Sequence, residues 1–310
     1  MAIHTPEKMV LSEAWPSLPL AQWQQTCDTL HMWTQIVGKI RLTLTPPINH
    51  WWHVPLYVTA RGLTTSPIPD PQGKSRCFEM IFDLIEHDLH ILTGEGTCKT
   101  LPLIPRSVAD FYQEVMTSLS ALGIDVTINP LPCEVNNPIP FDQDHVHHSY
   151  DPVYANRFWR ILEQTEYVMR QYRSSFIGKS SPIHFFWGSF DLALSFFSGR
   201  PAPERPHADR ITREAYSHEV ISCGFWPGDE RFPEPAFYAY ISPAPAGLDR
   251  LTLRPAAAFY HADLGEFLLR YKDVRKAKQP ALTLLRFFQS CYEGCAELAH
   301  WDRKALEKQP

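Results

Sequence analysis

Residues 183–200, IHFFWGSFDLALSFFSGR, decide the fold class of this chain, because they combine six Phe and Trp residues with no proline. Such a run favours a buried strand or a pair of strands. His184 and Asp191 lie within it, and an unpaired buried polar group costs roughly 2–7 kcal/mol. These two side chains therefore either satisfy each other or line a cavity.

The composition is that of a folded protein with a large core, since 44% of the 310 residues are hydrophobic and 20% are charged. A net charge of −5 and the lack of a Lys/Arg-rich run argue against a nucleic-acid partner. No apolar run approaches the ~20 residues of a membrane-spanning helix, and residues 1–10 lack the apolar segment of a signal peptide. Seven scattered cysteines without a C-x-x-C pair fit a reducing compartment. We therefore expect a cytoplasmic protein with no membrane partner.

Apolar periodicity and turn residues predict a mixture of helices and strands. Residues spaced three and four apart predict helices over residues 20–37, 107–122, 154–176 and 280–299. Alternation and aromatic runs predict strands over residues 39–45, 51–63, 77–86, 88–93, 101–103, 216–225, 236–241 and 250–253. Residues 129–152 contain five prolines and no periodicity, which indicates a linker.

The two halves of the chain present the same order of motifs. The first helix of each half ends at a similar triplet, VGK at 37–39 and IGK at 177–179. Each triplet is followed by a histidine and two aromatic residues, HWW at 50–52 and HFF at 184–186. A later strand of each half then contains a glutamate, at 79 and at 219. We therefore predict an α+β fold of two related units, each a helix, antiparallel strands and a helix, with the sheets joined or packed and the helices outside. The units are residues 1–128 and 153–310, with the Pro/His-rich linker at 129–152. The alternative is a single α+β domain in which the similar order of motifs in the two halves is a coincidence.

The aromatic strands supply the first candidate site. Side chains alternate between the two faces of a strand, so Trp187, Ser189 and Asp191 form a polar strip with an aromatic wall. His184 and Phe186 lie on the opposite face. His50 and Trp52 occupy the matching place in the first half. Aromatic walls with a few fixed polar groups are typical of small-molecule sites, and the alternative is a core in which each polar group bonds to a neighbour.

A second candidate is the pair His218 and Glu219, with Glu79 at the matching place in the first half. Glutamate inside an apolar strand is unusual, because it is rarely buried unpaired. Glu219 is therefore a candidate general acid or base, or a metal ligand beside His218. The alternative is an inward glutamate paired with Arg61, or else with Arg41 or Lys179.

Asp144, His145, His147 and His148 form a third candidate, since imidazole and carboxylate bind zinc, iron or nickel. Their spacing is looser than that of H-E-x-x-H, so a solvated surface cluster is the alternative. A divalent metal is therefore a minority prediction, and no other cofactor is predicted. The chain contains no G-x-G-x-x-G, and the P-loop and nucleophile-elbow patterns fail at Arg173 and Asp191.

Four stretches carry a family resemblance: LHMWTQIVGKIRL at 30–42, NHWWHVPLYVTARGLTTSPIP at 49–69, HFFWGSFD at 184–191 and YSHEVISCGFWPG at 216–228. They resemble a family of uncharacterised bacterial proteins that is classed only as a domain of unknown function. The resemblance covers nearly the whole chain and implies a bacterial, cytosolic origin. The resemblance does not imply any particular activity, cofactor or catalytic residue.

Together these observations predict an aromatic cleft between the units that binds, and as an enzyme transforms, a small organic molecule. In that reading Glu219 is the acid or base, His218 or His184 is its partner, and Asp191 orients an imidazole. The predicted ligand-binding residues are Trp52, His50, Arg61, Phe186, Trp187 and Glu79. The alternatives are a metal-dependent enzyme that uses the histidine cluster and a non-catalytic binding or interaction protein. The sequence does not indicate the substrate or the oligomeric state.

Overall fold

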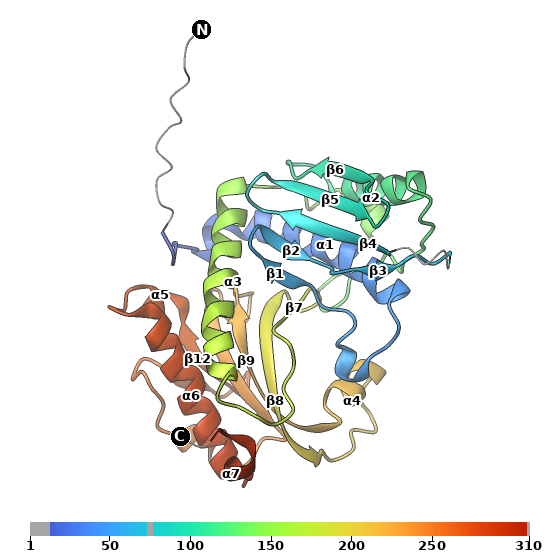
Figure 1. Cartoon of the computed structure of the whole chain (residues 1–310). Helices are drawn as coiled ribbons and strands as arrows, with labels where there is room; N and C mark the ends of the chain where they lie inside the picture. The colour runs from blue at the N-terminus through green and yellow to red at the C-terminus, as the bar shows by residue number, and fades with distance from the viewer. Residues whose placement is uncertain (1–12, 73–76, 309–310) are drawn as a thin grey trace.

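The structure is a computed structural model that describes residues 13–72 and 77–308. It contains two antiparallel sheets with helices packed against them, which confirms the α+β prediction (Figure 1). The first sheet has the order β1-β2-β4-β5-β6, with β3 also paired to β4, and the second has the order β11-β12-β10-β9-β8-β7. Each half of the chain therefore starts with a long helix, continues as a meander of antiparallel strands and closes with a helix.

The strands of the first sheet are β1 (Tyr57–Thr59), β2 (Gly62–Thr64), β3 (Ile68–Pro69), β4 (Cys77–Asp83), β5 (Asp88–Thr93) and β6 (Cys98–Pro102). Those of the second are β7 (His184–Phe186), β8 (Asp191–Pro201), β9 (His218–Trp226), β10 (Ala236–Ser242), β11 (Phe259–His261) and β12 (Glu266–Arg270). The α-helices are α1 (Leu20–Leu44), α2 (Val108–Ala121), α3 (Pro152–Arg173), α4 (Arg210–Ala215), α5 (Tyr271–Arg275), α6 (Pro280–Leu298) and α7 (Arg303–Leu306). Three 3₁₀ turns are η1 (Asn49–Trp51), η2 (Phe141–Gln143) and η3 (Leu248–Arg250).

The first helix is longer than its sequence predicts. α1 continues through Gly38 to Leu44, so the glycine stop and the strand at 39–45 are wrong. Gly38 is needed for packing instead, because a Cβ at this position would overlap the indole of Trp187. Ile40 and Arg41 are buried in the last turns of α1, so tertiary packing overrides the local alternation.

The segment 183–200 forms a pair of strands, as predicted. β7 and β8 pair in antiparallel register, and residues 187–190 make the turn between them. The turn interrupts the alternation, so Asp191 lies opposite Phe186 and shares its face, and the predicted strip on the face of Phe185 is wrong. The predicted strand at 51–63 is also wrong, since it contains η1, a loop and the β1–β2 hairpin. Residues 250–253 form no strand, whereas β11 and β12 were not predicted.

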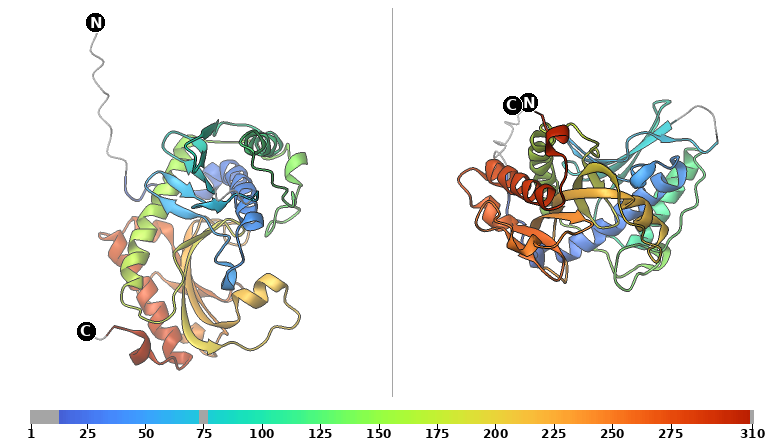
Figure 2. Two further views of the ribbon diagram at one scale, coloured as in Figure 1. Left: turned by 45° about the vertical axis from the view of Figure 1, so that its right-hand side comes forward. Right: turned by 90° about the horizontal axis from the view of Figure 1, so that it is seen from below.

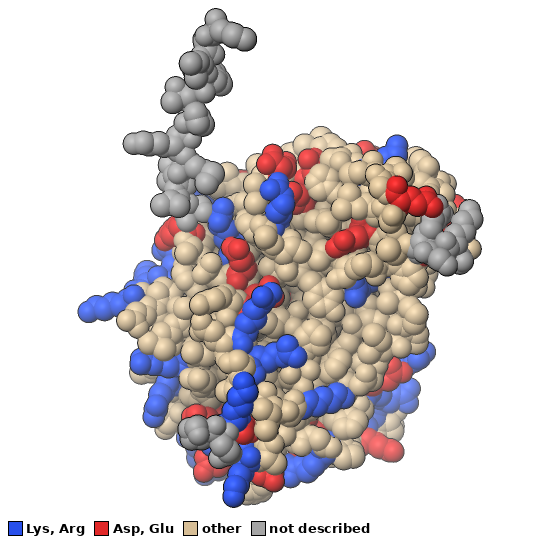
Figure 3. Space-filling view, viewed as in Figure 1, with Lys and Arg blue, Asp and Glu red and all other residues tan. Residues whose placement is uncertain are grey.

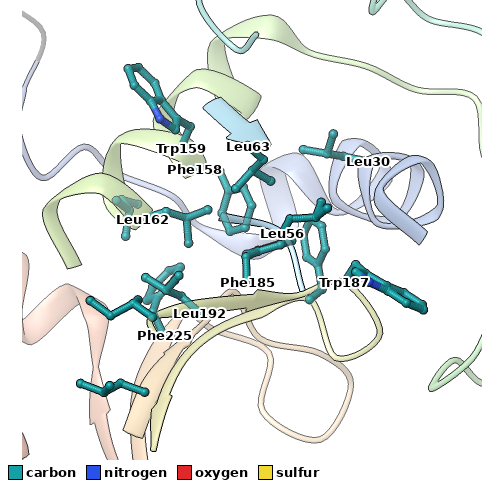
Figure 4. Packing of buried hydrophobic residues seen from close by; sticks show 14 of the residues in the cluster. Leu30, Leu56, Leu63, Phe158, Trp159, Leu162, Phe185, Trp187, Leu192 and Phe225 are labelled. Carbon is teal, nitrogen blue, oxygen red and sulfur yellow. The ribbon is translucent and has the colours of Figure 1, made fainter. Parts of the chain in front are cut away.

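The two sheets meet at their edges. Leu56, just before β1, and Phe185 in β7 exchange two backbone hydrogen bonds of 2.9 Å. One hydrophobic core runs across this junction: Phe158 contacts both Phe185 and Phe225, and Figure 4 shows Leu56 beside Phe185. The division of the chain at residues 128 and 153 stays a prediction, because the core is continuous across it.

The linker at 129–152 lies along α1 and α2, where it is the green segment between α2 and α3 in Figure 2. The side chain of Gln35 in α1 bonds the backbone N–H and C=O of Cys133, each at 2.9 Å. Phe141 is fully buried, and Asp151 caps α3 by accepting hydrogen bonds from Val153 and Tyr154. The linker is therefore a packed wall of the molecule.

The face in Figure 3 carries both signs of charge. Lys and Arg gather over its lower half, and Asp and Glu lie among them. Several are ion pairs one helical turn apart, such as Arg170 with Glu166 in α3. None of the helices of the described residues is long and apolar enough to cross a membrane.

Candidate functional site

A hollow of about 890 Å³ lies where α1, the linker and the second sheet meet, and we call it the linker cleft. Its walls come from both halves of the chain. The first half of the chain contributes Asp28 and His31 from α1, and the linker contributes Glu134 and His147. The second half contributes Ser189 and Phe190 from the β7–β8 turn, and Trp226 and Arg231 from the end of β9 and the loop after it. None of the predicted ligand-binding or catalytic residues lines this hollow; of the other candidates named from the sequence, Asp144, His147 and Ser189 do.

His31 is held in one orientation at the wall of the cleft. Its Nε2 lies 2.9 Å from the carbonyl oxygen of Gly188. The amide Nε2 of Gln35, a donor, lies 3.0 Å from the same ring nitrogen, so the two contacts require opposite tautomers and together fix the position of the ring. The ring also packs against Phe190 at 4.8 Å between centroids. Burial lowers the pKa of His31 to about 4, so the imidazole is neutral at pH 7.

His147 is the second oriented imidazole of the cleft. Its Nδ1 lies 2.7 Å from Oδ2 of Asp144, which is fully buried and also accepts the backbone N–H of Val146 and of His147. Asp144 therefore fixes the ring and directs its proton to Nδ1, as a carboxylate behind a catalytic histidine does. The positive charge that His147 can carry acts on both His31 and Asp28, which places the three groups close together.

Carboxyl groups in and beneath the cleft keep their protons more tightly than usual. Burial raises the pKa of Asp28. Burial raises that of Glu134 as well, and the nearby negative charge of Asp191 adds to the effect. Glu266 in β12 has its pKa raised to about 7, by burial first and by Asp191 second, while Arg231 acts in the opposite sense. These shifts mark a region that resists accumulating further negative charge.

Asp191 is the buried centre of this acidic region. It accepts hydrogen bonds from Ser189, which lines the cleft, and from the hydroxyl of Tyr238 in β10. Burial raises its pKa, and these two donors act against that increase. Sequence analysis predicts that Asp191 orients an imidazole; it bonds to two hydroxyl groups instead.

The cation of the cleft is already paired. Arg231 lies 2.8 Å from Asp229 and above the indole of Trp226 at 5.7 Å. The other side chains that line the cleft are aromatic residues, the imidazoles of His31 and His147, and several carboxyl groups. Such a set can bind an organic cation and can exchange protons with it.

Four of the predicted site residues, His50, Trp52, His184 and His218, gather elsewhere. Together with Lys179 and Phe197 they form a group that we call the histidine–lysine cluster. The ring of His50 in η1 contacts those of Trp52, Phe197 and His218, at 4.6 to 5.7 Å between centroids. His184 contacts Trp52 at 6.0 Å and Phe186 at 5.3 Å. The structure thus joins predicted residues from both halves of the chain, although His50 and His184 do not occupy equivalent elements.

His184 is almost fully buried and neither of its ring nitrogens has a hydrogen-bond partner among the described residues. Burial lowers its pKa to about 3, and the positive charges of Arg41 and Arg173 act in the same direction. A neutral imidazole in an aromatic shell fits these surroundings. It does not meet Glu219 or Asp191 in a hydrogen bond, so the predicted catalytic pairing is absent among the described residues.

Glu219 and His218 point to opposite faces of β9, which overturns their pairing as acid and base. Glu219 forms an ion pair with Arg200 at 2.7 Å and accepts the hydroxyl of Ser198 at 2.9 Å. Arg200 also donates to the carbonyl of Ala299 at the end of α6. Glu219 therefore joins β8, β9 and α6.

The remaining predicted ligand-binding residues have structural partners. Glu79 accepts the hydroxyl of Thr64, and Arg61 pairs with Asp83, so neither pairs with the other. Trp187 donates from its indole to the carbonyl of Val54 at 2.8 Å and is 5% exposed. These three side chains fix the first sheet and the β7–β8 turn.

The structure does not bring the three linker histidines together. His145 lines a hollow beside α2, His147 lines the linker cleft, and His148 lines a third hollow beside α1. Within residues 13–72 and 77–308, no three His, Cys, Asp or Glu side chains are placed to hold a metal ion. The predicted metal site is therefore absent from the described part of the chain.

The sequence did not predict a functional role for Asp28, His31, Glu134 or Glu266. It indicated Lys179 only as an ion-pair partner for a glutamate. The one local signal was the spacing of Asp28 and His31, which places them on the same face of a helix. Glu134 sits in the linker and Glu266 in an unpredicted strand, so neither carried a periodic pattern.

Comparison with known families assigns the chain. A model described as a family of unknown function, DUF5996, matches residues 15–308, so the chain belongs to this family and the resemblance seen in the sequence is confirmed. Neither the comparison with curated proteins nor that with solved structures finds a match.

Proposed function

For this member of a family of unknown function, we propose that the linker cleft binds a small organic molecule that carries a positive charge. The observation that carries the proposal is the cleft itself: about 890 Å³ of space enclosed by segments from both halves of the chain. Ligand sites of small molecules commonly have volumes of about 300–1,000 Å³ and lie at junctions of this kind.

The acidic side chains that line the cleft indicate that the ligand is positively charged. Asp28 and Glu134 face the cleft without an ion-pair partner among the described residues, whereas Arg231 is paired with Asp229. Burial raises the pKa of both acids, which means that each resists ionisation until a positive charge comes near. An amine at this position would restore their usual ionisation, and Trp226 and Phe190 would cover its apolar part.

Titration with a matched set of compounds tests this proposal. Benzylamine, benzyl alcohol and benzoate share one skeleton and differ in charge, and their binding is measured by calorimetry. We expect benzylamine to bind most tightly, and the double variant Asp28→Asn, Glu134→Gln to weaken it at least about tenfold, or about 1.4 kcal/mol.

Asp249→Asn is the matched control, because Asp249 is 69% exposed and lies outside the cleft. Equal affinity for benzoate and benzylamine, or unchanged binding in the double variant, would exclude a cation site.

A catalytic role for the same cleft is favoured by one further observation. Nδ1 of His147 is fixed by Asp144, and its other ring nitrogen is left to take part in proton transfer beside the neutral imidazole of His31. If the protein is an enzyme, His31→Gln and His147→Gln abolish conversion of a bound amine, followed by mass spectrometry, and leave its affinity within about threefold. Conversion that survives both changes would leave only the binding function.

A further inference from the structure

Lys179 and His50 have the arrangement of a nucleophile and its base. Nζ of Lys179 lies 2.7 Å from Nε2 of His50. An ammonium group only donates hydrogen bonds, so Nε2 is the acceptor and the imidazole proton is on Nδ1. Nδ1 lies 3.2 Å from the carbonyl oxygen of Ala215, which accepts that proton and orients the ring. A nucleophile, a base within hydrogen-bond reach and a third group that orients the base form the general pattern of covalent catalysis.

Aromatic rings and basic groups surround Lys179. Its Nζ lies above the ring of Trp52 at 5.3 Å and that of Phe197 at 5.0 Å, and these contacts hold the ammonium group in place. No carboxylate of the described residues lies within ion-pair distance of it. The charged and titratable groups nearby include His50 and His218 and, around His184, Arg41, Arg173 and Tyr57. Burial lowers the pKa of Lys179, in agreement with this environment.

The turn that carries His50 is strained. His50 and the following Trp51 both have left-handed backbone conformations, with φ of 58° and 61°. Non-glycine residues rarely adopt this conformation, and such strain is concentrated at functional sites. The strained turn holds the imidazole against Lys179 while the amine stays reachable, because Lys179 is solvent-exposed.

We propose that Lys179 is a reactive amine that forms an imine with a small aldehyde or ketone, and that His50 acts as its base. The ammonium group passes a proton to His50, and the neutral nitrogen forms a bond to the carbonyl carbon. His50 returns that proton to the carbonyl oxygen as the C–N bond forms, which leaves two hydrogens on the nitrogen. A second proton then passes from the nitrogen through His50 to the same oxygen, the C–O bond breaks and water leaves. One ammonium and one carbonyl give one protonated imine and one water, with no change in charge or oxidation state. Trp52 and Phe197 provide apolar surface for the group attached to the carbonyl.

This site is separate from the linker cleft. His50 contacts Phe197, which lies six residues along β8 from Asp191, a separation of about 20 Å in an extended strand. The proposal therefore does not depend on the function of the cleft.

Trapping of the imine tests the proposal on the full chain. The protein is exposed briefly at pH 7 to limiting benzaldehyde with cyanoborohydride, and the labelled peptides are quantified by mass spectrometry. We expect Lys179 to be labelled at least about tenfold faster than the exposed Lys278 of the same molecule, because His50 lies within hydrogen-bond reach of Lys179 and a positioned base contributes ~10²–10⁴-fold.

His50→Asn tests the base, because asparagine tolerates the left-handed conformation but does not accept the proton. We expect labelling of Lys179 to slow about a hundredfold, the lower end of what a positioned base contributes. Circular dichroism checks that the variant folds, and the comparison of Lys179 with Lys278 in the unchanged protein needs no variant. Labelling of Lys179 no faster than that of Lys278, or an unchanged rate in a folded His50→Asn protein, overturns the proposal.

Discussion

The linker cleft and the histidine–lysine cluster lie toward opposite ends of β8 and have opposite electrostatics. At the cleft, burial raises the pKa of Asp28, Glu134 and Glu266. At the cluster, burial lowers that of His50 and His184. The leading cause is the same in every case, because removal of water disfavours whichever form is charged. The comparison shows that burial in one fold can favour the protonated form of acids at one place and the neutral form of bases at another.

The β7–β8 turn connects the two regions, so its disruption is expected to have the largest effect. Trp187 packs on Gly38 and bonds to Val54 in the middle of the shared core. We expect Trp187→Ala to lower the free energy of unfolding by about 3–5 kcal/mol, as measured by urea denaturation at pH 7. Trp226→Ala, in the half-buried wall of the cleft, should cost clearly less. Equal losses would mean that the turn has no special role in joining the regions.

The cluster should lose stability in acid. The ordinary pKa of a histidine is 6.5 and that of folded His184 is about 3, so only the unfolded chain takes up this proton between these values. Stability therefore falls as the pH drops from about 6.5 towards 3. By pH 4 the loss that His184 causes is about 3 kcal/mol, and His184→Phe should abolish it.

Urea denaturation of both proteins at pH 7 and pH 4 measures that difference. The control is His145→Phe, because His145 is exposed and its replacement should leave the pH dependence unchanged. Parallel loss of stability in the wild type and in His184→Phe would contradict a neutral, buried His184.

The acidic region should lose stability in the opposite direction. Glu266 has a folded pKa of about 7 against 4.5 for the ordinary group, so folding favours its proton. That stability is present below about pH 4.5 and is lost as the pH rises through 7. Glu266→Gln keeps the group neutral and should raise the free energy of unfolding at pH 8 by about 1–3 kcal/mol, with no gain at pH 4. Glu297→Gln, on the exposed face of α6, should produce no such gain, and an equal one would assign the effect to net charge.

The smallest effect is expected at the position that the sequence favoured most. Glu219 belongs to neither region, and its pair with the half-exposed Arg200 is worth about 0–1 kcal/mol. Glu219→Gln should change the unfolding free energy by no more than that and leave the affinity for benzylamine unchanged. A tenfold loss of affinity, found by the same calorimetric titration, would show that Glu219 takes part in ligand binding.

Local patterns predicted the elements whose signals are contained within a few residues. β5 has the predicted bounds and α2 begins after Ser107, whereas α3 ends at Arg173, before the predicted end at 176. Gly38 shows why such signals fail. A glycine stops a helix when the backbone needs a left-handed turn, but here it is required by an indole from a residue 149 positions further along the chain (187 − 38 = 149).

The candidate sites depend even more on distant contacts. The sequence marked His50, Trp52, His184 and His218 as unusual, and the structure brings these four into one cluster. It did not indicate Lys179, because an exposed lysine carries no pattern until its neighbour is known. It also paired His218 with Glu219, although adjacent residues of a strand point to opposite faces.

The sequence alone determined the fold class, the β7–β8 hairpin, the packed helices and the family, because these follow from periodicity, capping and motifs along the chain. The tertiary structure decided which polar groups lose water and which partner each one meets. His31 meets the carbonyl of Gly188 and Lys179 meets His50 only after the two halves share a core. The pKa values that define both sites arise from that burial, which no local segment specifies by itself.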